Sequence, residues 1–88
     1  MKIEETLSDR EKTYGDFANY CEILDCLKKS VKPYSQELNY VHTGGLDMIL
    51  SKIARILNGD PDHIDSWHDI AGYATLVEKG IRNGSSNA

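Results

Sequence analysis

The sequence lacks the features that define several large classes of protein. No run of residues approaches the ~18 apolar positions of a membrane-spanning helix, and residues 1–5 contain no apolar core of a signal peptide. The two cysteines, Cys21 and Cys26, are five residues apart, a spacing that fits neither a redox pair nor a zinc site. We therefore expect a cytoplasmic protein without a membrane partner, in which both thiols are reduced and lie in or near the core.

An excess of positive charge is also absent. Ten Lys and Arg stand against fourteen Asp and Glu, which gives a formal net charge of −4 and argues against nucleic acid as a partner. The chain contains no phosphate-binding glycine loop, no dinucleotide-binding fingerprint and no G-x-S-x-G element. Strand-like alternation and internal repeats are missing as well. These absences exclude the common enzyme signatures and leave open whether the protein is an enzyme.

What the sequence does have is helical periodicity. Residues 4–12 are polar but favour a helix, and predict a short first helix that residues 13–16 break. Asp16 is a suitable N-cap for a second helix, which must end by Pro33 because proline disfavours a helical residue before it. The apolar residues of this helix recur every three or four positions: Phe17, Tyr20, Cys21, Leu24, Leu27 and Val31.

Two further amphipathic helices follow a connector that spans residues 33–45, with a turn of helix around 36–41. The first has an apolar stripe of Leu46, Ile49, Leu50, Ile53, Ile56 and Leu57. It ends at Asn58-Gly59, where we expect the glycine to adopt a left-handed conformation. We expect Asp60 to cap the next helix and Pro61 to begin it. The inward side of that helix is predicted to be Ile64, Trp67, Ile70, Ala71, Ala74, Val77 and Ile81.

The predicted fold is therefore all-α, a small bundle of three main helices plus a short N-terminal helix. It forms a single domain over residues 1–81, followed by a polar, flexible C-terminal tail over residues 82–88. A domain of this size buries only about 60–65% of the surface that its unfolded chain exposes. We therefore expect homo-oligomerisation, as a dimer or a larger assembly, to complete the core.

Lys52 and Arg55 are the candidate phosphate-binding residues. They are three positions apart and so project from the same side of a predicted helix. Arginine binds phosphate through its planar fork, and lysine binds it as a mobile point charge. The alternative is a solvated face that pairs with Asp47 or with a carboxylate of the next helix.

Asp65, Asp69 and Asp47 are the candidate metal ligands. Asp65 and Asp69 are four residues apart on one predicted helix, and Asp47 lies on the preceding one. Hard cations such as Mg²⁺ bind carboxylate oxygens in this kind of arrangement, with water and substrate phosphates completing the shell. Alternatively, Asp65 stabilises the helix dipole, and Asp69 forms an ion pair with Lys52 or Arg55.

Tyr14 is the candidate residue for stacking on a base. With Gly15 and Phe17 it precedes a helix N-terminus, where free backbone N–H groups can meet an anion. In such a position, however, Tyr and Phe are more often residues of a hydrophobic staple or of the core. The three histidines do not have metal-ligand spacing, and we expect them on the surface: His42 in a loop, His63 and His68 in the third main helix region.

Three segments carry a resemblance to a known family. They are residues 10–17 (REKTYGDF), residues 46–60, which include KIARILNGD, and residues 65–76 (DSWHDIAGYATL). Together they resemble a phage and prophage family of small proteins of unknown function, over most of the chain. The resemblance implies a bacteriophage-encoded protein of the host cytoplasm and implies no activity.

A more distant similarity is to nucleotide-modification-associated domains and to all-α nucleoside triphosphate pyrophosphatases of the MazG and dUTPase type. It implies Mg²⁺-dependent hydrolysis of a nucleotide between its α and β phosphates by two pairs of helical acids. Here only Asp47 stands for the first pair. Asp69 matches the last acid, but Ser66 stands three residues before it and Asp65 is displaced by one position.

Two functional hypotheses follow. The first is a nucleotide-binding protein or a degenerate MazG-like pyrophosphohydrolase, with Mg²⁺ as its only expected cofactor. The alternative is a non-enzymatic oligomeric interaction protein that binds a host or phage protein. The arrangement of Asp47, Lys52, Arg55, Asp65 and Asp69 in space is the observation that separates them best.

Overall fold

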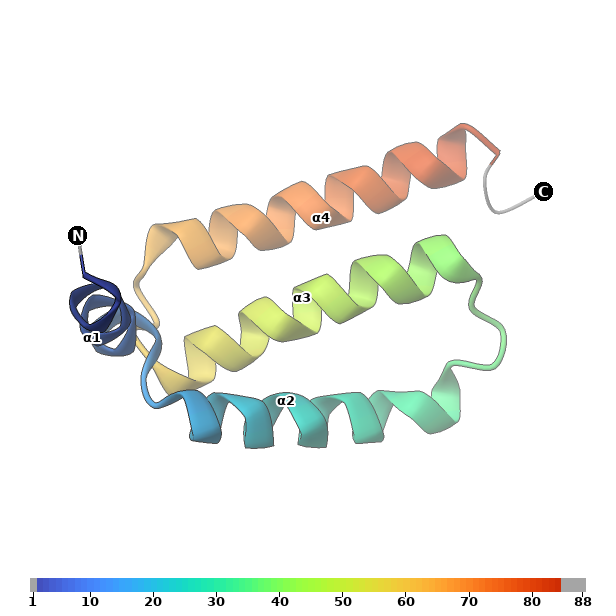
Figure 1. The fold of residues 1–88 in the computed structure, drawn as a ribbon. Coiled ribbons are helices and arrows are strands. Elements are labelled where there is room, and N and C mark those ends of the chain that lie inside the picture. The colour runs from blue at the N-terminus through green and yellow to red at the C-terminus, as the bar shows by residue number, and fades with distance from the viewer. Residues whose placement is uncertain (1, 85–88) are drawn as a thin grey trace.

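The computed structural model describes residues 2–84, and every regular element in them is helical (Figure 1). The predicted all-α fold, a small bundle of three main helices plus an N-terminal one, is confirmed. None of the described helices has the length and apolar character that crossing a membrane requires. The elements are α1 (Ile3–Tyr14), α2 (Phe17–Val31), the short 3₁₀ helix η1 (Lys32–Tyr34), α3 (Tyr40–Asn58) and α4 (Ile64–Arg82).

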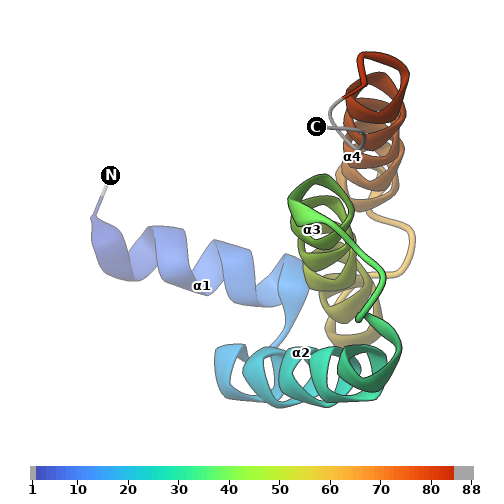
Figure 2. The same ribbon diagram turned by 90° about the vertical axis from the view of Figure 1, so that its right-hand side faces the viewer.

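The three long helices form a single row. In Figure 2, α2 lies below α3 and α4 lies above it, and α1 projects away from one face of the row. Only α3 is therefore covered on two sides. Its residues Leu50 and Ala54 are the only buried apolar residues in the described part of the chain.

This arrangement corrects the predicted inward side of the last helix. In α4, Ile64 is 77% exposed and Trp67 is 55% exposed, whereas Ser66 is buried. The thiols of Cys21 and Cys26, which we expected in or near the core, are exposed as well. A helix at the edge of a row has one neighbour, so an apolar stripe as wide as that of α4 extends beyond the contact.

The ends of α2 agree with the sequence. The Asp16 carboxylate accepts a hydrogen bond of 3.1 Å from the backbone N–H of Asn19, as an N-cap does. The helix ends at Val31, and Pro33 lies in the 3₁₀ turn that follows.

The start of α3 does not agree, because the helix begins at Tyr40 instead of Leu46. The side chain of Asn39 accepts hydrogen bonds from the N–H groups of Val41 and His42, and the His42 ring accepts one from Asn39 in return. This capping box places His42 in the helix and not in a loop. Gly45 lies within this helix, and glycine is required there because a side chain would collide with Val77 of α4.

The predicted start of α4 is also wrong. The helix begins at Ile64 with His63 at the N-cap position. Asp60 lies three residues before this N-cap, and its carboxylate accepts from the N–H of Asp62, so it caps the preceding turn and not the helix. Residues 60–63 form a turn instead. Of the predicted tail, Arg82 ends α4, and residues 85–88 lie outside the described residues.

Candidate functional site

The connection between α1 and α2 is bound to the C-terminal end of α3. The Asn58 side-chain amide donates to the carbonyl of Tyr14 at 2.9 Å and to that of Asp16 at 2.8 Å. The hydrogen bond from the Asp60 N–H to the Thr13 carbonyl adds a third link. We call this contact between residues 13–16 and 58–60 the clasp. It fixes the position of Tyr14 relative to α3.

Both glycines of the clasp are required by its geometry. Gly15 has a φ of +79°, a left-handed conformation that L side chains rarely adopt, and a Cβ there would collide with the Asn58 carbonyl. Gly59 has a φ of −133°, so the left-handed conformation that we predicted for it is wrong. A Cβ on Gly59 would collide with the Thr13 carbonyl and lie 2.5 Å from the Cα of Tyr14. Close backbone approach, not helix termination, explains this glycine.

A pocket of about 460 Å³ opens between α1, α2 and α3 beside the clasp. We call it the Tyr14–Arg55 pocket. Its lining combines aromatic rings, two arginines and one carboxylate: Leu7, Arg10, Glu11, Tyr14, Gly15, Phe17, Tyr20 and Arg55.

Arg55 is held in this pocket by aromatic rings. Its guanidinium carbon lies 4.9 Å from the ring centre of Tyr14 and 5.2 Å from that of Tyr20, within the range of cation–π attraction. Arg10 lies 5.0 Å from the Tyr14 ring centre. The Nε of Arg55 is buried and has no hydrogen-bond partner in residues 2–84. A buried donor without an acceptor is costly, which makes Arg55 the least satisfied polar side chain of the site.

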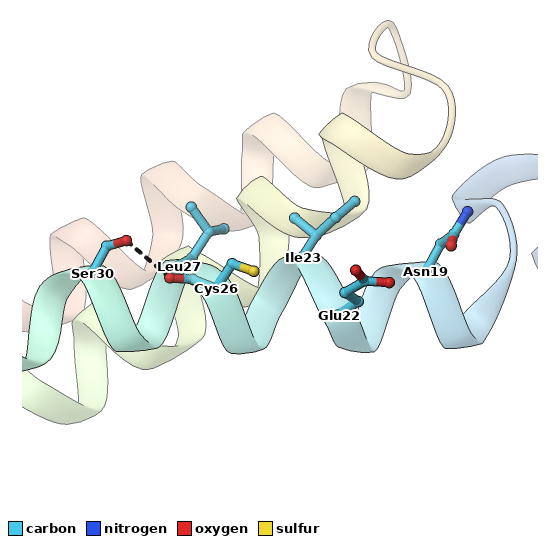
Figure 3. A pocket seen from close by; sticks show the side chains of 6 residues that line it. All are labelled: Asn19, Glu22, Ile23, Cys26, Leu27 and Ser30. Carbon is cyan, nitrogen blue, oxygen red and sulfur yellow. Dashed lines mark hydrogen bonds between the residues drawn. The ribbon is translucent and has the colours of Figure 1, made fainter.

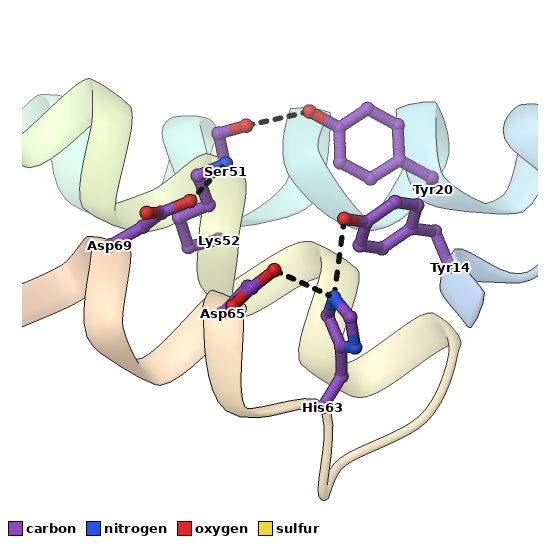
Figure 4. A network of polar contacts seen from close by, with 7 residues as sticks. All are labelled: Tyr14, Tyr20, Ser51, Lys52, His63, Asp65 and Asp69. Atoms are coloured by element: carbon purple, nitrogen blue, oxygen red, sulfur yellow. Dashed lines mark hydrogen bonds and ion pairs between the residues drawn. The ribbon is translucent and has the colours of Figure 1, made fainter. Parts of the chain in front are cut away.

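A network of polar contacts continues from the pocket across the row (Figure 4). The hydroxyl of Tyr20 on α2 hydrogen-bonds to that of Ser51 on α3 at 2.7 Å. The Tyr14 hydroxyl lies 3.4 Å from Nε2 of His63, which is 3.8 Å from the Asp65 carboxylate. His63 is thus half-buried against Tyr14 instead of lying free on the surface. With the Lys52–Asp69 ion pair between α3 and α4, these separate contacts involve all four helices on one face.

The two candidate phosphate-binding residues have separate partners. Lys52 forms an ion pair of 3.1 Å with Asp69, which is one of the two pairings that the sequence suggested. The Lys52 side chain is only 17% exposed, against 43% for Asp69. Arg55 interacts instead with rings from α1 and α2. Of the two cations, Arg55 is the one that lines a pocket and lacks a carboxylate partner among the described residues.

The three candidate metal ligands do not come together within one chain. Residues 2–84 contain no group of three or more His, Cys, Asp or Glu that could hold a metal ion. Asp69 is paired with Lys52, the 81% exposed Asp65 side chain lies near His63, and Asp47 is exposed on α3. A Mg²⁺ site built from these acids therefore stays a prediction that involves a second subunit or release of Asp69.

Among the pocket residues that sequence reasoning missed are the two that contact Tyr14 or Arg55, namely Arg10 and Tyr20. Tyr20 was assigned to an apolar stripe, and Arg10 was given no role. One signal was present, because Arg10 and Tyr14 are four residues apart and so adjacent on a helix. The contact of Tyr20 with Arg55 is between different helices and has no local signal.

A second hollow of about 420 Å³ runs along α2 (Figure 3). Its polar side chains are uncharged except for Glu22, and the Ser30 hydroxyl already donates to the Cys26 carbonyl at 3.0 Å. Also on α2, a hydrogen bond to Asp25 and its negative charge raise the pKa of Lys29, which is fully exposed. Neither feature provides a site comparable to the Tyr14–Arg55 pocket.

Substitution of Asp69 by asparagine tests the half-buried ion pair. It leaves the mostly buried Lys52 ammonium without its counter-charge, and we expect the free energy of unfolding to fall by about 1–2 kcal/mol. Asp25→Asn is the matched control, because the Asp25–Lys29 pair is exposed and should contribute less than about 0.5 kcal/mol. Urea denaturation measures both variants, and equal effects would contradict a structural role for Lys52–Asp69.

Comparison with known proteins identifies the family of this chain. A family profile matches residues 2–80, so the protein belongs to the family described as a domain of unknown function, DUF6378. No match is found among curated proteins or among solved structures. The matched range includes the clasp, the Tyr14–Arg55 pocket and the polar network.

Proposed function

We propose that this protein binds a phosphate-bearing small molecule of the nucleotide type in the Tyr14–Arg55 pocket. The main support for this proposal is the environment of Arg55. Two tyrosine rings hold its guanidinium in place, but its buried Nε has no acceptor among residues 2–84. A guanidinium that is already ordered loses little side-chain entropy on binding an anion. An oxygen of a phosphate would supply the acceptor that this donor lacks, and it reaches the buried Nε only if the two tyrosine rings move.

The rest of the pocket favours a nucleotide over inorganic phosphate. Arg10 adds a second positive charge. The two arginines and the single carboxylate of Glu11 give the pocket lining a net positive charge. Phe17 and Tyr14 provide rings for stacking of a base, which on Tyr14 would share the ring with Arg10 and Arg55. The volume of about 460 Å³ lies within the range of small-molecule sites.

The finer version of this proposal rests on the sequence resemblance. It makes the protein a phage-encoded, degenerate relative of the MazG-type pyrophosphohydrolases, with Asp65, Asp69 and Asp47 as Mg²⁺ ligands. Lys52 would bind phosphate only after its release from Asp69. Pyrophosphate release from deoxynucleoside triphosphates with Mg²⁺ is the measurement, and Asp69→Asn should abolish it if the carboxylate binds metal.

Calorimetric titration with deoxynucleoside mono- and triphosphates tests the binding proposal. We expect Arg55→Lys to weaken binding about 10–100-fold, because it removes the planar fork and its aromatic stacking while it keeps the charge. Arg82→Lys is the matched control, since Arg82 is exposed, pairs with Glu78 far along α4 and should leave affinity unchanged.

Thermal unfolding provides an independent readout. A ligand at ~100 times its dissociation constant stabilises the native state by about 2.7 kcal/mol, which corresponds to a clear rise in Tm. If no nucleotide binds or raises the Tm of the wild-type protein, the proposal is wrong. Equal loss of affinity in the Arg55 and Arg82 variants would place the site elsewhere.

A second candidate is a non-enzymatic interaction protein that binds a host or phage protein. The observation in its favour is a pair of nearly fully exposed tyrosines at the connection between α2 and α3, Tyr34 (85% exposed) and Tyr40 (97% exposed). Tyrosine is enriched at the centres of protein interfaces. In this case Tyr34→Ser with Tyr40→Ser would abolish binding of the partner, and nucleotides would have no effect on stability.

A further inference from the structure

The row of helices has an uncovered apolar face, and we propose that a second copy of this chain packs against it. We call this surface the apolar seam. Its residues come from α3 and α4: Leu46, Ile53, Leu57, Trp67, Ala74 and Ile81.

Helical geometry places the seam on the face away from α1. Successive residues of an α-helix are rotated by about 100°, so Leu46, Ile53 and Leu57 lie roughly 160–180° from Arg55. Arg55 faces the pocket beside α1. On α4, Trp67 lies about 160° from Asp69, which belongs to the polar network. The polar and apolar faces of the row are thus opposite one another.

The seam is spaced for helix-to-helix packing. Leu46 and Ile53 are seven residues apart and Leu57 follows after four, while Trp67, Ala74 and Ile81 recur every seven residues. This is the spacing of residues that face a partner helix. Yet within the single chain Leu57 is 64% exposed, Trp67 55% and Ile81 44%. The seam residues thus have the spacing for packing against a helix, but within residues 2–84 much of their surface stays exposed.

The exposed area agrees with a missing layer. The chain exposes 6565 Å², whereas a monomer of its mass typically exposes about 5,200 Å². The excess of about 1,400 Å² exceeds the ~800 Å² that each partner buries in a standard stable interface. The projecting helix α1, which has no buried residue, accounts for part of this excess, and the uncovered seam for another part. The radius of gyration, 15.1 Å, is likewise larger than the ~12 Å of a compact domain of this length.

The lack of a second layer of helices favours a second copy of this chain as the partner that covers the seam. Stable domains bury apolar faces between two layers of secondary structure, and this chain supplies one layer. Every copy has the same uncovered seam, and a two-fold axis would place the same surface of both copies against each other. The six seam residues are uncharged, and the two charged residues beside them on α4, Glu78 and Arg82, neutralise each other in an ion pair. The Tyr14–Arg55 pocket lies on the opposite face, so the proposal does not depend on nucleotide binding.

Light scattering coupled to size exclusion tests the proposal with two leucine variants. The wild-type protein should have the mass of a dimer, and Leu57→Glu should reduce it to that of a monomer or unfold it. Leu76→Glu is the matched control, since Leu76 is 61% exposed, close to the 64% of Leu57. Leu76 lies nine residues from Trp67, on the opposite side of α4, and its variant should stay dimeric.

The single tryptophan supplies a readout that needs no substitution. Trp67 should be shielded in the dimer, so its emission should shift to longer wavelength on dilution, over the concentrations at which the mass falls. Interfaces of this size dissociate between about μM and pM, so the wild-type protein should be dimeric at about 100 μM. A monomer at that concentration would overturn the proposal, as would loss of the dimer in Leu76→Glu but not in Leu57→Glu.

Discussion

Gly59→Ala is expected to lower the free energy of unfolding by about 4 kcal/mol, most of the stability of a marginal domain of this size. The added Cβ would lie 2.5 Å from the Tyr14 Cα and 2.7 Å from its carbonyl carbon, and would also collide with the Thr13 carbonyl. All of these atoms belong to the backbone and cannot rotate away. The clasp must therefore open, and Tyr14 then loses its alignment on Arg55. Urea denaturation measures the loss.

Gly72→Ala is the control for this substitution. Gly72 lies within α4, and a Cβ there would meet no atom within 4 Å. Alanine in a helix interior is favoured over glycine by about 0.5–1 kcal/mol, so this variant should become more stable. If both variants changed stability in the same direction, the close approach in the clasp would not explain Gly59.

Asn58→Asp is expected to lower the free energy of unfolding by about 2–3 kcal/mol, although it replaces only the side-chain NH₂ group by an oxygen. The amide of Asn58 donates to the carbonyls of Tyr14 and Asp16. A carboxylate has no proton to donate at neutral pH, so both hydrogen bonds would be replaced by repulsion between oxygens. The loss should diminish at low pH, where protonation of the new carboxyl group restores one donor.

Asn19→Asp makes the same chemical change at an exposed position in the first turn of α2. A negative charge near a helix N-terminus interacts favourably with the helix dipole, so stability should change by less than about 0.5 kcal/mol. Circular dichroism during thermal unfolding compares the two variants. Similar losses in both would assign the effect to net charge instead of to the clasp.

Features that depend on neighbouring residues were predictable. The Asp16 cap and the end of α2 at Val31 follow from a carboxylate before a helix and a proline after it. The start of α3 was missed because Gly44 and Gly45 favour a loop when considered alone. The capping box at Asn39 and the contact of Gly45 with Val77 outweigh that preference.

The site was predictable in part. The pair of Lys52 with Asp69 followed from opposite charges on two helices expected to be adjacent. The role of Arg55 was not accessible, because Tyr14 and Tyr20 reach it from α1 and α2. Gly59 had a plausible local explanation, a left-handed helix end, that proved wrong. Its actual requirement is a contact with residues more than forty positions earlier in the chain.

By itself the sequence determined the number of helices, most of their extent and which side of each is apolar, but not where α3 and α4 begin. These properties arise from spacings of three and four residues and from caps, which act within a few residues of each other. Only the tertiary structure decided which apolar sides are covered. Three helices in a closed bundle and three in a row have the same periodicity, but a row buries little beyond Leu50 and Ala54 and leaves Leu57 and Trp67 exposed. The clasp and the pocket depend on the same long-range arrangement, because each joins side chains or backbone from different helices.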